Sequence, residues 1–190
     1  RELAGFEAAE IGGAAITSVT GNGNQYTVTA STGTDNGTLG LNLVDNDTIV
    51  DASANPLAGP GVNGSFTGQI YTLDKLAPTV TINQAAGQAD PTNASPINFT
   101  VTFSETVTGF AASDISFAGS TVGGTLTAVV TGSGTTYNVA VSGMSNSGTV
   151  VVSVPAGAAT DAAGNASLAA TNTDNAVTYN APASAATARN

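Results

Sequence analysis

The side chains that could do chemistry in this chain are almost all carboxylates. The 190 residues include 13 Asp and Glu, no His and no Cys, and the three basic residues are Arg1, Lys75 and Arg189. Without His or Cys, neither a Ser-His-Asp nor a Cys-His catalytic arrangement can be built, and no thiolate metal site exists. We therefore expect a protein that is not an enzyme and whose acidic residues are its main candidate ligands.

A set of oxygen-bearing residues forms the candidate metal site: Asp74, Glu105, Asp114, Asp161 and Asn165. The sequence has no basic residue between Lys75 and Arg189 that could neutralise these carboxylates. Clustered carboxylates repel one another unless a cation intervenes, and Ca²⁺ accepts about six to eight oxygen ligands in irregular geometry. The alternative is that these residues only shape turns, because Asp161 and Asn165 flank Gly164 as Asx turns do.

The elements that must position these residues are β-strands. Val, Thr, Ile, Tyr and Phe alternate with polar residues in short runs, and Gly, Asn, Ser, Asp and Pro separate the runs, which is typical of half-buried strands joined by turns. No segment carries an apolar stripe of helical period. Seven strands are predicted in the second half of the chain: 79–82, 97–103, 114–118, 125–130, 136–142, 148–154 and 175–179.

An internal repeat divides the chain. Val19–Tyr26 matches Val130–Tyr137, Asp51–Asn55 matches Asp161–Asn165, and Gly5–Ile11 matches Gly109–Ile115. The period of roughly 105–110 residues is that of a β-sandwich domain. Tyr26 and Tyr137 begin equivalent strands, and we expect both to pack in a core.

We therefore expect an all-β protein of tandem immunoglobulin-like β-sandwiches, whose first copy lacks its first two strands. The boundaries are 1–76 for the partial domain, 77–180 for a complete domain and 181–190 for a tail or linker. An incomplete sandwich exposes apolar faces and unpaired strand edges. Either the first copy is part of a longer array, or a neighbouring subunit supplies the missing strands.

Four segments together resemble the bacterial Ig-like domain family of large surface proteins and adhesins. They are Ala77–Ile82, the run from Phe103 to Phe110, the turn Gly132–Tyr137, and Asp161–Asn165. The resemblance implies a β-sandwich that serves as a spacer or adhesive unit in long secreted proteins. This sequence departs from the repeat where Ala54 replaces Gly164, Asn180 replaces Asp74 and Arg1 stands near the place of Glu105.

In the Ig topology, the incoming linker, the loop after the second strand and the loop before the last strand reach the same pole of the sandwich. These segments carry the five candidate ligands, so we expect them to converge there. The hypothesis is an inter-domain calcium ion that stiffens the linker.

Net charge and hydropathy exclude some classes of binding partner. A net charge of −10 argues against nucleic acid and against anionic membrane surfaces, and no apolar run approaches the ~20 residues of a membrane helix. The expected location is extracellular, on the cell surface. The expected partners are neighbouring Ig-like domains or identical subunits, and a host or cell-surface ligand. A structural or adhesive module is the first interpretation, an extracellular filament subunit the alternative, and glycan binding or hydrolysis a third.

Overall fold

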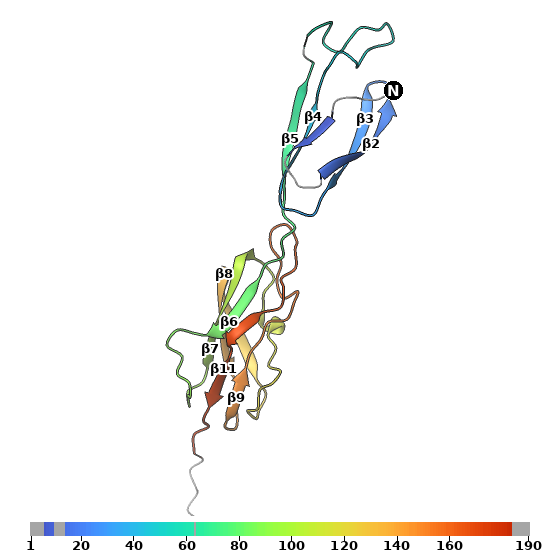
Figure 1. The fold of residues 1–190 in the computed structure, drawn as a ribbon. Coiled ribbons are helices and arrows are strands. Elements are labelled where there is room, and N and C mark those ends of the chain that lie inside the picture. Colours follow the sequence, from blue (N-terminus) through green and yellow to red (C-terminus); the bar gives the residue numbers. More distant parts are fainter. Residues whose placement is uncertain (1–5, 10–13, 63, 184–190) are drawn as a thin grey trace, which may run out of the picture. The chain divides into compact units, whose positions relative to one another are not determined.

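The chain folds into β-strands gathered in two compact units, Arg1–Leu76 and Ala77–Asn190 (Figure 1). The structure, a computed structural model, describes residues 6–9, 14–62 and 64–183. Apart from one short 3₁₀ segment, η1 (Ala112–Asp114), every regular element in the described part is a strand. No helix among these residues has the length and apolar character that crossing a membrane requires.

The first unit contains two sheets. A three-stranded antiparallel sheet has the order β1 (Phe6–Ala9), β4 (Gly37–Leu43), β5 (Phe66–Leu73). The second sheet is the hairpin of β2 (Ala14–Asn22) and β3 (Gln25–Thr32). Among the residues of this unit whose burial is described, only Gly40 is fully buried.

The second unit is a sandwich of two sheets. The larger sheet has the order β10-β6-β7-β8, and the smaller pairs β11 with β9. The bounds are β6 (Val80–Gln84), β7 (Ile97–Val107), β8 (Thr127–Ser142), β9 (Gly148–Val151), β10 (Thr171–Asp174) and β11 (Ala176–Tyr179). The prediction of an all-β sandwich is confirmed.

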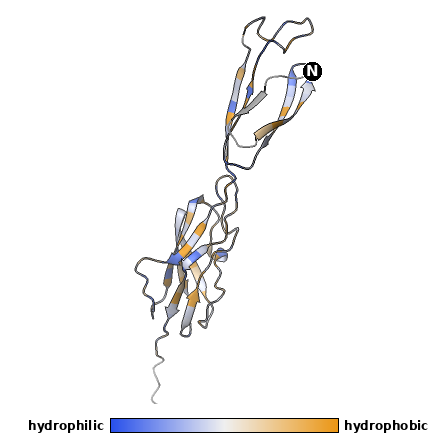
Figure 2. Ribbon diagram, in the orientation of Figure 1, coloured by the Kyte–Doolittle hydropathy of each residue, from blue (hydrophilic) through white to orange (hydrophobic). Residues whose placement is uncertain are grey.

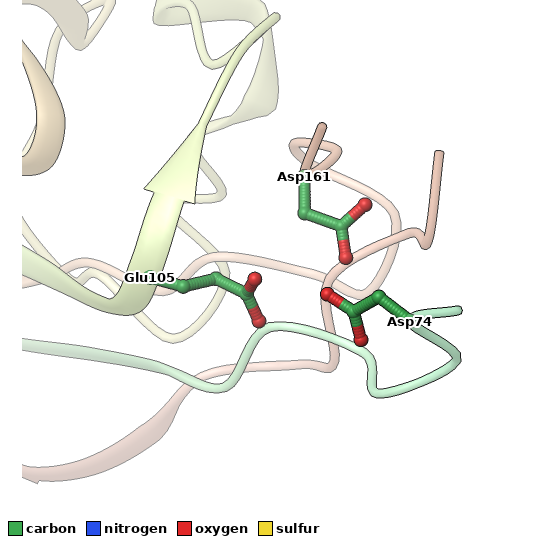
Figure 3. A group of neighbouring side chains, drawn as sticks. All are labelled: Asp74, Glu105 and Asp161. Carbon is green, nitrogen blue, oxygen red and sulfur yellow. The ribbon is translucent and has the colours of Figure 1, made fainter. Parts of the chain in front are cut away.

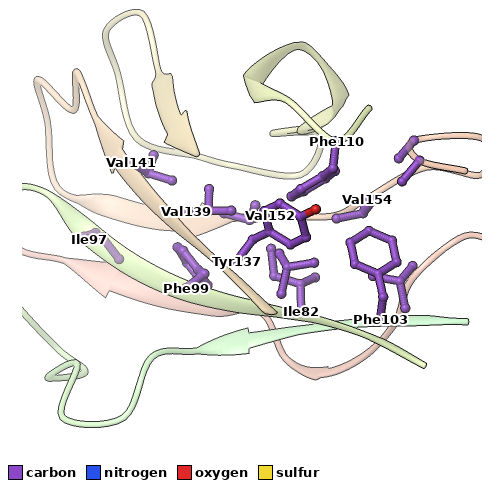
Figure 4. Close-up of a cluster of buried hydrophobic side chains, with 14 of the residues drawn as sticks. Ile82, Ile97, Phe99, Phe103, Phe110, Tyr137, Val139, Val141, Val152 and Val154 are labelled. Carbon is purple, nitrogen blue, oxygen red and sulfur yellow. The ribbon is translucent and has the colours of Figure 1, made fainter. Parts of the chain in front are cut away.

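Period-two alternation builds the core of the second unit. Along β7, the side chains of Ile97, Phe99, Val101 and Phe103 are buried, and polar residues stand between them. Figure 2 shows the same alternation of apolar and polar residues along the strands. The buried side chains of both sheets meet in one cluster (Figure 4). Burial of a Val, Ile or Phe side chain contributes roughly 1.5–3 kcal/mol each, so this cluster is the main source of the domain's stability.

An aromatic trio closes one end of this core. The rings of Phe103, Phe110 and Tyr137 meet edge to face, with centroids 5.1–5.8 Å apart. The Tyr137 hydroxyl donates a hydrogen bond to the Val107 carbonyl oxygen over 3.2 Å. A buried tyrosine needs such a partner for its polar end. The prediction that Tyr137 packs in the core is therefore confirmed.

The structure differs from the sequence-based predictions in four places. Residues 114–118 do not form a strand: Asp114 ends η1, and Ser116 makes only an isolated bridge to Ser153. The predicted strands 125–130 and 136–142 are one element, β8, that folds back on itself, since Thr127 Oγ1 and Ser142 Oγ lie 3.3 Å apart.

The other two differences concern a tyrosine and an unexpected strand. Tyr26 is 44% exposed, unlike its repeat equivalent Tyr137, so the prediction of a buried Tyr26 was wrong. The strand β10 was not predicted, because its sequence Thr-Asn-Thr-Asp has no apolar alternation. It forms by backbone pairing with β6 in parallel.

Candidate functional site

Three of the predicted ligands come together. Glu105 lies near the end of β7, Asp161 lies in the loop after β9, and Asp74 lies in the segment leading into β6 (Figure 3). Each offers a carboxylate oxygen, and these oxygens all lie within 4.8 Å of one another. Asp161 is buried, and the other two side chains are half-buried.

Asp161 is held by its own loop. Its Oδ1 accepts hydrogen bonds from the backbone N–H groups of Ala163 and Asn165, both at 2.8 Å, and its Oδ2 accepts one from Asn165 Nδ2 at 2.8 Å. We call this arrangement the Asp–Asn clasp. Burial raises the pKa of Asp161, but the hydrogen bonds from Asn165, Ala163 and Gly164 outweigh it, so the pKa lies below the ordinary value.

The first unit contains the same clasp. Asp51 Oδ1 accepts hydrogen bonds from the N–H groups of Ser53 and Asn55, and Asn55 Nδ2 donates to Asp51 Oδ2 over 2.9 Å. The hydrogen bonds from the Asn55 side chain and backbone and from Ser53 lower the pKa of Asp51. A clasp therefore forms locally from the spacing of Asp and Asn, as the turn-forming alternative for Asp161 and Asn165 proposed.

Asp74 is anchored by contacts with Asn36. Asn36 Nδ2 donates to Asp74 Oδ1 over 2.8 Å, and Asn36 Oδ1 accepts the Lys75 N–H over 2.7 Å. Lys75 Nζ donates to the carbonyl oxygens of Thr32 and Gly33. Sequence reasoning missed Asn36, whose only signal was its place before Gly37 in a turn.

Asp114 lies outside the carboxylate group. Its Oδ2 accepts the Ala111 N–H over 2.8 Å and so closes the turn of η1. The side chain therefore has a structural role that needs no metal ion. Of the five predicted ligands, the structure brings together three carboxylates, clasps Asn165 to one of them, and gives Asp114 a separate task.

The donor set fits a hard cation, because all three groups offer carboxylate oxygen. Calcium prefers such ligands and tolerates uneven geometry. When bound, the ion would neutralise the mutual repulsion of Asp74, Glu105 and Asp161. Exposed acidic groups are also common without an ion, so calcium binding stays a prediction.

A family model described as bacterial Ig-like domain matches residues 74–180. The chain belongs to the bacterial Ig-like domain family. In this bacterial Ig-like chain the match begins at Asp74, so all three clustered carboxylates lie within the matched stretch. The family is typically non-enzymatic and is associated with structural or adhesive modules of surface proteins. Comparisons with curated proteins and with solved structures gave no match.

Proposed function

We propose that this chain is a non-catalytic structural or adhesive module of an extracellular bacterial surface protein, and that residues 1–76 are a second, partial Ig-like domain. The family match over residues 74–180 carries the proposal. In support of the proposal, the buried apolar residues of the second unit pack in one cluster between its two sheets. The repeated Asp–Asn clasp supports the Ig-like assignment of the first unit.

The location is tested with an antibody raised against the whole chain. On intact cells of the source bacterium the antibody should label the surface, as seen by immunogold electron microscopy. Pre-incubation with purified chain should abolish the labelling, which is the control for specificity. Labelling only after the cells are permeabilised would contradict the proposal.

Adhesion is tested separately. Purified chain should compete with the bacterium for attachment to host cells or to neighbouring bacteria. The control is a protein of similar size and net charge, which separates specific binding from electrostatic repulsion. Surface labelling without competition would leave the structural role and remove the adhesive one.

A second candidate is a filament subunit completed by strands from a neighbour. The observation that favours it is the exposure of large apolar side chains in the first unit, notably Phe66, Ile70 and Tyr71. Such residues are normally covered in a finished sandwich. Negative-stain electron microscopy of the purified chain should then show polymers whose number rises with concentration. Monomers at every concentration would exclude this candidate.

A further inference from the structure

The first unit has an apolar hollow that nothing in its described part fills. Val28 and Ala30 of β3, Leu39, Gly40 and Leu41 of β4, and Tyr71 of β5 line this hollow of about 210 Å³. Phe66 and Ile70 on β5 are about two-thirds exposed. A hollow lined by apolar side chains binds apolar groups, because water gains few hydrogen bonds there.

Beside the hollow lies the free edge of β3, where the Lys75 ammonium binds the Thr32 carbonyl oxygen at the end of the strand. In the described part of the chain, β3 pairs only with β2. From Ala14 to Thr34 the sequence contains no charged residue and no proline. Edge strands that face solvent are usually guarded by charges, prolines or bulges on the edge itself. The composition of β3 is that of a strand with a neighbour on both sides.

The second unit shows which neighbour fits. By the repeat, Tyr26, Val28 and Ala30 correspond to three buried residues of β8 that pair with β7. The antiparallel register sets Val101 opposite Tyr137, Phe99 opposite Val139, and Ile97 opposite Val141. All six of these side chains are buried. The strand that covers this edge therefore has an apolar residue at every second position and small polar residues between them.

We propose that β3 is an acceptor edge for a β-strand donated by another Ig-like module. The incoming strand is of the β7 type and runs antiparallel to β3. It sets alternate apolar side chains opposite Tyr26, Val28 and Ala30, and these side chains fill the hollow. The inference deepens the filament candidate above and rests on the first unit being a partial Ig-like domain.

A labelled peptide with the sequence of Ile97–Glu105 is the direct probe. Added to the full chain at concentrations where the peptide alone is monomeric, it should bind saturably. NMR signals of Tyr26–Ala30 should shift, and a spin label at the peptide's carboxyl end should broaden Tyr26 more than Ala30. A peptide with Asp in place of Phe99 and Val101 is the control and should bind at least about tenfold more weakly.

Variants of the acceptor complete the test. Val28→Asp should weaken binding about tenfold or more, whereas Val129→Asp, at an exposed position of the second unit, should leave it unchanged. If Val28→Asp fails to fold, the nearly isosteric Val28→Thr takes its place and should weaken binding by a smaller factor. NMR spectra of each variant without peptide show whether the variant folds, and so separate weaker binding from loss of folding.

Several results would overturn the proposal. They are no binding at about 1 mM peptide, equal binding of the Asp-substituted peptide, shifts confined to the second unit, and pairing of β3 with β3 of a second copy. Polymers in the electron microscope without peptide binding would reject the acceptor edge but leave the filament candidate standing. Surface labelling of the bacterium tests the module's location independently of both.

Discussion

At the scale of single residues, the two clasps differ in the residue that adopts the left-handed backbone conformation. Ala54 has φ of +65° and Gly164 has φ of +91°, each within the turn closed by its Asp–Asn clasp. Left-handed backbone conformations cost an alanine about 1–2 kcal/mol, whereas glycine adopts them freely. The first unit thus carries backbone strain that the second avoids.

This difference gives a matched pair of substitutions. Ala54→Gly should raise the stability of the first unit by about 0.5–1 kcal/mol, because relief of strain exceeds the added entropy of the unfolded chain. Gly164→Ala should lower the stability of the second unit by about 1 kcal/mol, since a Cβ there would meet no atom within 4 Å and only strain remains. Urea unfolding of each variant measures both, and a loss of stability in Ala54→Gly would contradict the strain argument.

The Asp51 clasp should make the first unit sensitive to acid. Since the folded pKa of Asp51 lies below the ordinary 3.8, the clasp's stabilisation is present above that value and is lost as the pH falls through the lowered pKa. Urea midpoints between about pH 5 and pH 2 should fall less steeply for Asp51→Asn than for the unmodified chain. Parallel curves for the two proteins would show that this carboxylate does not contribute.

Calcium binding is tested at Glu105. If the ion binds there, excess Ca²⁺ should raise the melting temperature of the second unit by several degrees over equal Mg²⁺, as ligand linkage of about 2–3 kcal/mol requires. Glu105→Gln should remove most of the shift. Asp114→Asn is the matched control and should retain the shift, because Asp114 lies outside the carboxylate group. Equal shifts in both variants would place the ion elsewhere, and no shift in any protein would end the calcium hypothesis.

At the scale of elements, β8 depends on one glycine more than on its neighbour. Gly132 has φ of +117°, and a Cβ added there would lie 2.5 Å from the Thr136 carbonyl oxygen and 2.9 Å from Tyr137 Cα. Gly134 has φ of +72°, but a Cβ there would meet nothing within 4 Å. The first position combines a steric clash with strain, and the second has strain alone.

Gly132→Ala should therefore destabilise the second unit by about 2–4 kcal/mol, and Gly134→Ala by about 1 kcal/mol. Thermal or urea unfolding measures the difference. Equal losses in the two variants would mean that the hairpin adapts to the added methyl group. Comparing the two variants also tests the aromatic trio, because the methyl group added at residue 132 would lie against Tyr137 Cα.

Strands with buried apolar residues were the elements most readily predicted from the sequence. β6 and β7 follow from alternation, because a half-buried strand must bury every second side chain. β10 could not be predicted in this way, since its sequence has no apolar alternation and it is held to β6 by backbone pairing and polar side-chain contacts, among them Gln84 Nε2 to Asp174 Oδ1. Residues 114–118 failed as a strand because the Asp114 carboxylate caps a turn, a local hydrogen bond that competes with strand pairing. The carboxylate group followed from topology, but the contacts of Asn36 did not, since they join residues 38 and 39 positions apart.

At the scale of the whole molecule, acidic residues far outnumber basic ones. The net charge is −10, and the Lys75 ammonium is bound to carbonyl and hydroxyl oxygens of the first unit. Repulsion between carboxylates therefore opposes folding more than ion pairs favour it. About 0.5 M NaCl screens such repulsion beyond a few ångströms and should raise the melting temperatures of both units. KCl should act equally, and a fall in both melting temperatures would show that the carboxylates are already compensated.

The hydrogen bond from Asn36 to Asp74 depends on an asparagine that can deamidate slowly. Asparagine followed by glycine, as in Asn36-Gly37, slowly loses its amide nitrogen in water, and thermolabile asparagines are correspondingly depleted in heat-adapted proteins. The aspartate so formed could no longer donate to Asp74 Oδ1 and would set a second negative charge against it. Stored or aged protein should thus lose this contact, and because Asn22-Gly23 and Asn63-Gly64 are Asn-Gly pairs as well, peptide mapping by mass spectrometry would assign the change to Asn36.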